Sequence, residues 1–144
     1  MIILDIKGLT VVYHTDQGTV GALDELNFAI GKGEIVGLVG ESGCGKSTMG
    51  KTIQRVLPEP SAEVVSGSIC FQGVNLLELS EREINARVRG RAITIIPQDP
   101  FVSFNPVFTI GTQILDVVKY KLAIGNRKRG GIKYWLNKLI HPSS

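Results

Sequence analysis

Cysteine is scarce in this sequence, and long apolar runs are missing. Cys44 and Cys70 are its two cysteines, so we expect no structural disulfide, and a reducing cytoplasm fits. No apolar run approaches the ~18–20 residues that a membrane-spanning helix needs. The first residues, Met1–Lys7, have no basic segment before their apolar stretch, and we therefore predict no signal peptide.

Acidic residues are absent after Asp116, whereas seven lysines and arginines follow it. The net charge of +3 therefore comes from the C-terminal part of the chain. A basic tail is not a basic domain, so we predict no nucleic-acid partner. The 144 residues, 43% hydrophobic and 20% charged, are enough for one soluble domain with a core.

The most informative stretch is Gly40–Thr48, which reads GESGCGKST and matches the phosphate-loop pattern G-x-x-x-x-G-K-[ST]. The apolar run Glu34–Val39 before it predicts a buried strand, and Ser47–Val56 after it predicts a helix. Strand, glycine-rich turn and helix is the context that this motif requires. A glycine-rich turn without a ligand is the alternative, and the four matching positions in this context argue against it.

The residue types in this loop suit a phosphate. Glycines let the backbone curl around the anion with its N–H groups inward, and the helix start adds the positive end of its dipole. Lys46 is predicted to reach the β- and γ-phosphates, and the Ser47 hydroxyl to ligate Mg²⁺. Cys44 needs no catalytic role. The predicted nucleotide-binding residues of the loop are Gly40, Glu41, Ser42, Gly43, Cys44, Gly45, Lys46, Ser47 and Thr48.

Four further strands and one turn are predicted around the loop. Two strands, Ile2–Val12 and Ala22–Ile30, precede it. After it, Ser68–Gln72 reads as a short strand, and the β-branched run Ala92–Ile96 as a buried strand that Pro97 stops. Pro58–Ser61 is a surface turn between the predicted helix and the third of these strands.

Helix signals follow in the second half. Ser80 and Glu83 form a capping box, and Gly90 suits a left-handed C-terminal cap. Thr109 is the predicted N-cap of another helix, whose apolar stripe is Ile110, Ile114, Val117, Val118 and Leu122. A basic linker then leads to a short amphipathic helix with apolar positions Ile132, Trp135, Leu136, Leu139 and Ile140. Three interpretations of this last segment stay open. It is a helix that binds a membrane surface or a partner, the product of a shifted or truncated reading frame, or a helix that folds back on the exposed core.

Three further features accompany the phosphate loop. Tyr13 follows the first predicted strand, Ile95–Pro100 reads IIPQDP, and Ser103–Val107 reads SFNPV. Together they resemble the nucleotide-binding subunit of ABC transporters, most closely the oligopeptide and dipeptide import subfamily. The likeness also includes Ser80–Arg91 and runs from about Ile3 to Val118, and it ends past Leu122.

The resemblance implies residue roles. Tyr13 would stack on adenine, and Gln98 would help to hold Mg²⁺ and orient the attacking water. Lys46 and Gln98 are thus the candidate catalytic residues, with Ser47 and Gln98 as metal ligands and ATP and Mg²⁺ as cofactors. The segment from Ser103 would touch the membrane subunit. Alone, Tyr13 reads as a strand-end aromatic that covers the core, and Gln98 as a turn residue.

The implied fold is α/β, the N-terminal part of an ABC-type P-loop NTPase: an antiparallel β region plus an incomplete parallel-sheet core. Residues 1–124 would form this truncated domain, and residues 125–144 a divergent basic tail. The implied function is ATP-driven import of oligopeptides, dipeptides or similar solutes. Integral-membrane permease subunits and a second ATP-binding subunit would be the partners, with the peptide handled indirectly through the permease. The location would be cytoplasmic, peripheral on the inner face of the cell membrane.

The sequence also departs from the family pattern. After Gln98 we find no Leu-Ser-Gly-Gly-Gln signature, no apolar strand ending in Asp-Glu and no switch histidine, since no strand precedes His141. We therefore predict that this chain does not hydrolyse ATP alone, and a non-hydrolysing nucleotide-binding remnant is the alternative function. The missing segments include strands that would neighbour those present, so an exposed apolar edge is expected. An unrelated GTPase or kinase is disfavoured by the strands before Glu34 and by the Gln98 segment.

Overall fold

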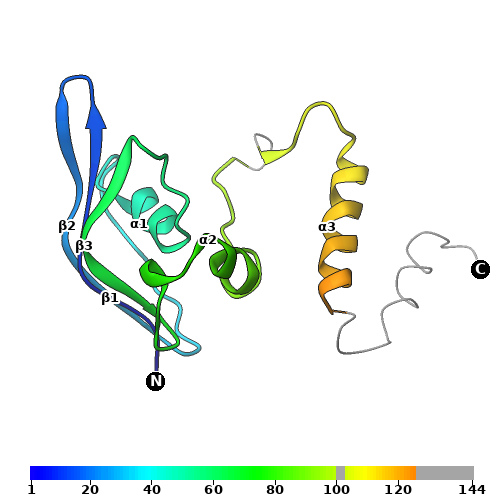
Figure 1. Ribbon diagram of the computed structural model, residues 1–144, viewed down its shortest axis with the longest axis horizontal. Helices are drawn as coiled ribbons and strands as arrows, with labels where there is room; N and C mark the ends of the chain where they lie inside the picture. The colour runs from blue at the N-terminus through cyan, green and yellow to red at the C-terminus, as the bar shows by residue number, and fades with distance from the viewer. Residues whose placement is uncertain (100–102, 126–144) are drawn as a thin grey trace, which may run out of the picture. The chain divides into compact units, whose positions relative to one another are not determined.

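The computed structural model describes residues 1–99 and 103–125, and it divides the chain into two compact units, Met1–Ile95 and Ile96–Ser144. The first unit contains a four-stranded antiparallel sheet of order β2-β1-β3-β4 (Figure 1). Its strands are β1 (Ile2–Thr15), β2 (Gly18–Gly31), β3 (Ala62–Phe71) and β4 (Val74–Asn75). The two predicted strands before the phosphate loop are confirmed, and the third begins earlier than Ser68 because Ala62–Ser66 also pairs with β1.

A glycine bulge interrupts the alternation of β1. Leu4 and Ile6 are buried, and the next buried pair, Leu9 and Val11, is one residue out of phase. Gly8 between the pairs has a φ of 55°, in the left-handed region. A Cβ on the facing Gly67 would lie only 2.5 Å from the Gly8 carbonyl oxygen. The close backbone approach of β1 and β3 therefore requires glycine, and the bulge keeps both apolar pairs on the core face.

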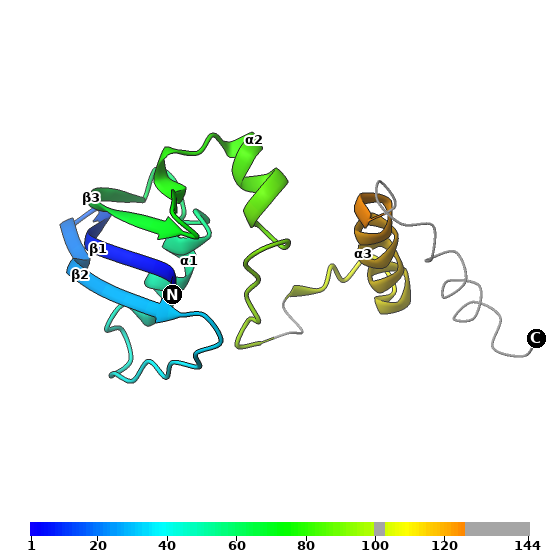
Figure 2. The ribbon, with the colours of Figure 1, turned by 90° about the horizontal axis from the view of Figure 1, so that it is seen from below.

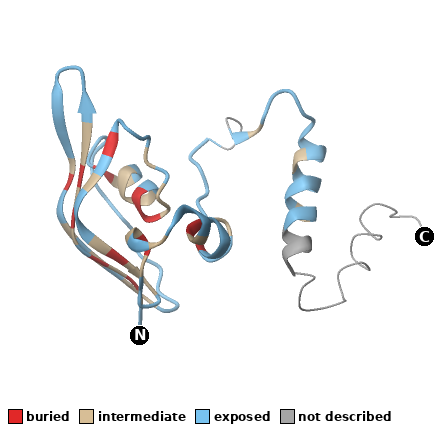
Figure 3. Ribbon diagram, in the orientation of Figure 1, coloured by how far each residue is buried: buried red, intermediate tan, exposed pale blue. Residues whose placement is uncertain are grey.

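Short helices pack against one face of the sheet, as Figures 1 and 2 show for α1. They are α1 (Lys46–Ile53), η1 (Leu76–Glu78) and η2 (Ile84–Val88), the last with π-helical geometry, and the short α2 (Glu81–Glu83) before η2 buries no residue. In Figure 3 the buried positions gather where the sheet and these helices meet. The buried apolar side chains are Leu4, Ile6, Leu9, Val11, Leu23, Ile53, Ala62, Ile69, Leu76, Ile84 and Val88.

The predicted capping box is confirmed at the start of α2. The Glu83 carboxylate accepts from the Ser80 backbone N–H at 3.0 Å, and the Ser80 hydroxyl accepts from the Glu83 N–H at 3.4 Å. The hydrogen bonds from Ser80 lower the pKa of the Glu83 carboxyl, since they favour its charged form. Gly90, after η2, has the predicted left-handed backbone with a φ of 63°.

The incomplete parallel core is not formed, which corrects our prediction of two buried strands. Glu34–Val39 and Ala92–Ile96 form no strand in the described residues, apart from an isolated parallel bridge between Arg89 and Ile93. Ile35 is 99% exposed and Ile96 is 90% exposed. The physical reason is that a buried parallel strand needs a hydrogen-bonded neighbour and cover on both faces. Neither segment finds such a neighbour within residues 1–99 and 103–125.

The second unit contains α3 (Ile110–Gly125). Thr109 caps it as predicted, because its hydroxyl accepts from the Thr112 N–H at 3.3 Å. The Gln113 side chain holds the preceding loop, accepting from the Asn105 N–H at 2.8 Å and donating to the Phe108 carbonyl at 2.9 Å. The predicted apolar stripe of α3 is largely exposed: Ile110, Ile114 and Val117 are exposed, and Val118 is half-buried.

Two predictions lie outside the part of the chain that the structure describes. They are the amphipathic helix at residues 132–140 and the side chain of Leu122, and the predicted boundary at 124/125 stays a prediction as well. Where helices are described, none has both the length and the apolar character that crossing a bilayer demands.

Candidate nucleotide-binding site

The phosphate loop connects an exposed extended segment to α1. The helix begins at Lys46, one residue earlier than predicted, and ends at Ile53 rather than Val56. Its N-cap is Gly45, with a φ of 90° and no side-chain capping hydrogen bond. Residues 40–44 are exposed, so the loop is open to a ligand.

Steric contacts explain why glycine occupies position 45. The residue is buried, and a Cβ there would lie 2.5 Å from the Ala22 carbonyl oxygen and 2.8 Å from Leu23 Cδ2. Its positive φ adds strain for any other residue. Gly43 has a similar φ of 86°, but nothing lies within 4 Å of its Cβ position. The loop therefore rests on β2 at Gly45 and faces open space at Gly43.

The backbone of the loop offers unused donors. Among the described residues, the N–H groups of Gly43, Gly45, Lys46 and Ser47 donate to no acceptor, whereas the Cys44 N–H bonds the Glu41 carbonyl at 3.3 Å. Free N–H groups at a glycine-rich helix start form a site suited to an anion. The loop therefore fits the phosphate groups of a nucleotide, on geometry as well as on sequence.

Lys46 curls back over this loop. Its ammonium donates to the carbonyl oxygens of Gly40 and Glu41, both at 2.6 Å, and to Cys44 Sγ at 3.2 Å. An ammonium has three donors, and a thiol is a weak acceptor. The contact with Cys44 is therefore the one that a phosphate oxygen displaces at least cost, while the two carbonyls keep the lysine at the loop. Cys44 forms no disulfide.

Tyr13 lies close to the first turn of α1. It stands near the end of β1, half-buried, and its hydroxyl is 3.5 Å from the Thr48 hydroxyl. Thr52 in turn donates to the Thr48 carbonyl at 2.7 Å. The Tyr13 ring therefore lies near the phosphate loop. It is a candidate to contact the base of a nucleotide whose phosphates bind to that loop. Stacking on adenine stays a prediction.

We expect Tyr13→Ala to reduce the preference for Mg·ATP over Mg·GTP, because stacking of an aromatic ring is worth about 0.5–1.5 kcal/mol. Tyr13→Phe is the matched control, since it removes the contact with Thr48 and keeps the ring. Titration of both nucleotides into each variant measures the ratio of dissociation constants. An unchanged ratio in Tyr13→Ala would contradict stacking on the base and would mean that Tyr13 only covers the core.

Gln98 belongs to the second unit, so it is described apart from the loop. The predicted pairing of Ser47 with Gln98 at Mg²⁺ therefore stays a prediction. Ser47 is exposed on the first turn of α1. Within residues 1–99 and 103–125, no cluster of three or more His, Cys, Asp or Glu side chains forms an alternative metal site.

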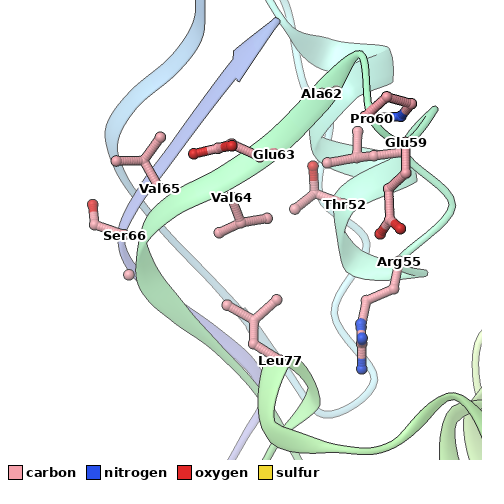
Figure 4. A pocket seen from close by; sticks show the side chains of 12 residues that line it. Thr52, Arg55, Glu59, Pro60, Ala62, Glu63, Val64, Val65, Ser66 and Leu77 are labelled. Carbon is pink, nitrogen blue, oxygen red and sulfur yellow. The ribbon is translucent and has the colours of Figure 1, made fainter.

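A pocket of about 510 Å³ lies away from the loop, near the C-terminal end of α1 (Figure 4). Thr52, Arg55, Glu63 and Leu77 are among its lining residues, and no phosphate-loop residue is. Sequence reasoning gave Arg55 no role. One signal for it in the structure is its left-handed backbone, with a φ of 52°, which sequence patterns do not reveal for arginine.

The comparisons with known proteins support the family that the phosphate loop and its neighbouring motifs predict. The sequence profile described as ABC transporter matches residues 23–141, a range that continues past Leu122, where we expected the resemblance to end. A probable peptide ABC transporter ATP-binding protein of Sinorhizobium fredii is 44% identical, over 82% of this chain and 35% of its own length. The oligopeptide transport ATP-binding protein of Bacillus subtilis is 40% identical, over 81% and 32%.

A third relative is the peptidoglycan transport ATP-binding protein of Agrobacterium fabrum, 43% identical over 85% of this chain and 22% of its own length. The chain thus spans about a third or less of the curated relatives that it matches. The profile match over most of the chain implies a P-loop NTPase, and the antiparallel sheet with the phosphate loop at the start of α1 is consistent with the N-terminal part of such a domain. The chain belongs to the ABC transporter family.

Proposed function

We propose that this chain provides the ATP-binding part of an ABC transporter that imports oligopeptides, dipeptides or similar solutes. The observation that carries the proposal is the loop of Gly40–Thr48, with unused N–H donors and Lys46 beside them. The solute class comes from the names of the relatives, of which peptide and oligopeptide transport proteins are the examples given above. The nucleotide class comes from the family.

The residues of the chain have separate tasks in this proposal. The loop amides and Lys46 bind the β- and γ-phosphates, and Tyr13 holds the base. Ser47 and Gln98 are the residues that would hold Mg²⁺, whose charge offsets that of the phosphates. Gln98 would also orient the attacking water. None of these tasks needs a further cofactor.

The proposed partners are those of an importer. Permease subunits in the membrane would receive the Ser103–Val107 segment and carry the peptide, so that the peptide does not touch this chain. A second ATP-binding subunit would complete the nucleotide site. The chain would then be peripheral on the cytoplasmic face of the membrane.

The proposal is tested by nucleotide binding. Lys46→Ala is expected to weaken Mg·ATP binding by about 1.5–3 kcal/mol, because a charge-assisted contact with phosphate is lost. Lys51→Ala is the matched control, because Lys51 lies exposed on the same helix, in its last turn. Isothermal titration calorimetry compares the three proteins. Equal affinity of the wild type and Lys46→Ala would contradict the assignment of the loop.

A non-hydrolysing nucleotide-binding module is the second candidate. The observation that favours it is the exposure of Ile35 and Ile96, in the two segments expected to form the parallel core. Under this candidate Lys46-dependent binding remains and turnover is absent.

A further inference from the structure

The C-terminal end of α1 is held by an unusual backbone conformation. The Arg55 N–H bonds the Thr52 carbonyl at 2.9 Å, and the Val56 N–H bonds the Lys51 carbonyl at 3.0 Å. These two bonds are those of a Schellman motif, in which the residue at the position of Arg55 is normally glycine. Arg55 has a φ of 52° there, which costs an ordinary residue about 1–2 kcal/mol. Because arginine occupies a position where glycine would avoid this cost, we expect its guanidinium to have a role.

The Arg55 side chain reaches across to η1 and the residue after it. One of its nitrogens donates to the carbonyl oxygens of Leu79 and Leu76, the latter at 3.4 Å. Figure 4 shows this side chain extending away from α1 beside the pocket wall. Three quarters of the side chain is buried, so these contacts are shielded from water.

Arg89 approaches the same helix end from η2. Its Nε donates to the Gln54 carbonyl at 2.8 Å, and its Nη2 donates to the Arg55 carbonyl. These carbonyls lie at the negative end of the dipole of α1, where a cation is stabilised. Only 22% of the Arg89 side chain is exposed.

Glu81 joins the two arginines. Its carboxylate accepts from Arg89 in the bidentate manner, at 2.8 and 3.3 Å, and lies 3.6 Å from Arg55 Nη2. The carboxylate therefore offsets the repulsion between two neighbouring guanidinium groups. We name this Arg55–Glu81–Arg89 set the helix-end brace.

The brace continues into a tight turn. Three backbone N–H groups, those of Arg91, Ala92 and Ile93, bond the Val88 carbonyl at 3.0–3.1 Å, and the Gly90 N–H bonds the Ile93 carbonyl at 2.9 Å. Arg89 is itself part of this turn. Arg89 therefore joins the C-terminal end of α1 to the turn that contains the amides of residues 90–93.

We propose that Arg89 is a positioning residue of the nucleotide site: through the helix-end brace it couples binding at the N-terminal end of α1 to the turn of residues 88–93. The inference rests on the proposed nucleotide binding. Because α1 has only eight residues, about 12 Å in length, its two ends move as one body. Arg89 touches no nucleotide in this scheme and acts through the helix.

Hydrogen exchange of backbone amides, with and without saturating Mg·ATP, tests the coupling. In the wild type we expect Mg·ATP to slow exchange about fivefold or more at the amides of residues 90–93, together with slowing at Met49 in the first turns of α1. In Arg89→Met the slowing at residues 90–93 is expected to disappear at saturating nucleotide, while that at Met49 remains. Arg89→Lys is expected to restore part of it, because the lysine ammonium can still donate to the carbonyls at the end of α1, although it lacks the planar fork of arginine.

Arg82→Met is the matched control, since Arg82 is exposed on α2 and its side chain forms no hydrogen bond or ion pair among the described residues. It should respond as the wild type does. A merely structural role of Arg89 would lower the melting temperature of Arg89→Met and leave the nucleotide-dependent slowing at residues 90–93 in place, which overturns the proposal. Glu81→Gln keeps the carbonyl contacts of Arg89, so it provides a milder variant in which partial slowing is expected even if Arg89→Met fails to fold.

The same experiment separates this inference from the proposed function. Slowing at Met49 without slowing at residues 90–93 in the wild type means that nucleotide binds and that the coupling is wrong. No slowing at either position, with no heat of binding in calorimetry, means that the nucleotide site itself is wrong, and the coupling falls with it.

Discussion

A polypeptide of these 144 residues is expected to release phosphate from ATP no faster than its Lys46→Ala variant, even where ATP binds. Hydrolysis needs a carboxylate that positions or deprotonates the attacking water, and assistance of that kind is typically worth ~10²–10⁴-fold in rate. After Gln98 the sequence contains only two acids, Asp99 and Asp116, and neither ends an apolar strand. The structure adds a second reason, because the segment before the loop, Glu34–Val39, forms no strand and Ile35 is 99% exposed, so no sheet orients the loop from that side.

The measurement is phosphate release by purified chain, with Lys46→Ala beside it to detect contaminating ATPases. Turnover that depends on Lys46 at an ordinary enzyme rate of ~1 s⁻¹ or faster would show that the chain contains its own catalytic carboxylate. The same reasoning can be tested by adding a polypeptide that contains the Leu-Ser-Gly-Gly-Gln signature and the apolar strand ending in Asp-Glu. Restored, Lys46-dependent turnover is then the expected result, since Lys46 and Ser47 are present in this chain.

Gly45→Ala is expected to destabilise the loop and β2 by about 3 kcal/mol, near the upper end of single substitutions, and to abolish measurable Mg·ATP binding. Two effects add at this position. The φ of 90° strains any residue with a Cβ, and the new atom would lie 2.5 Å from the Ala22 carbonyl oxygen, which is backbone and cannot rotate away. Chemical denaturation followed by circular dichroism measures the loss of stability.

Two glycines of the same region serve as controls. Gly43→Ala shares the positive φ but meets nothing within 4 Å, so only the strain of about 1–2 kcal/mol is expected. Gly50→Ala lies inside α1 with open space around its Cβ, and it should stabilise the chain by roughly 0.5–1 kcal/mol because alanine favours a helix. Equal losses in Gly45→Ala and Gly43→Ala would mean that the contact with Ala22 has no effect.

Local signals in the sequence predicted much of the first unit. Ser80 and Glu83 form their capping box through bonds within four residues, and Thr109 caps α3 in the same local way. The strands before the loop were also predictable, since their alternating apolar side chains pack on the core wherever their partner strand lies. The apolar patterns of Glu34–Val39 and Ala92–Ile96 predicted two buried strands, and these predictions were wrong. A pattern of this kind shows that a segment suits a buried strand, whereas a strand forms only where a neighbour offers hydrogen bonds and cover.

By itself, the sequence determined the chemistry of this protein. The order of glycine, lysine and serine in Gly40–Thr48 specifies an anion site at a helix start, because the backbone donors and the lysine follow from that order. Tertiary structure decided what the loop rests on and what holds the far end of its helix. Gly45 is required because Ala22, distant in sequence, lies against it, and Arg55 meets Arg89 and Glu81 only once the chain has folded. Contacts between residues far apart in the chain leave no periodic trace, so they become visible only in the folded molecule.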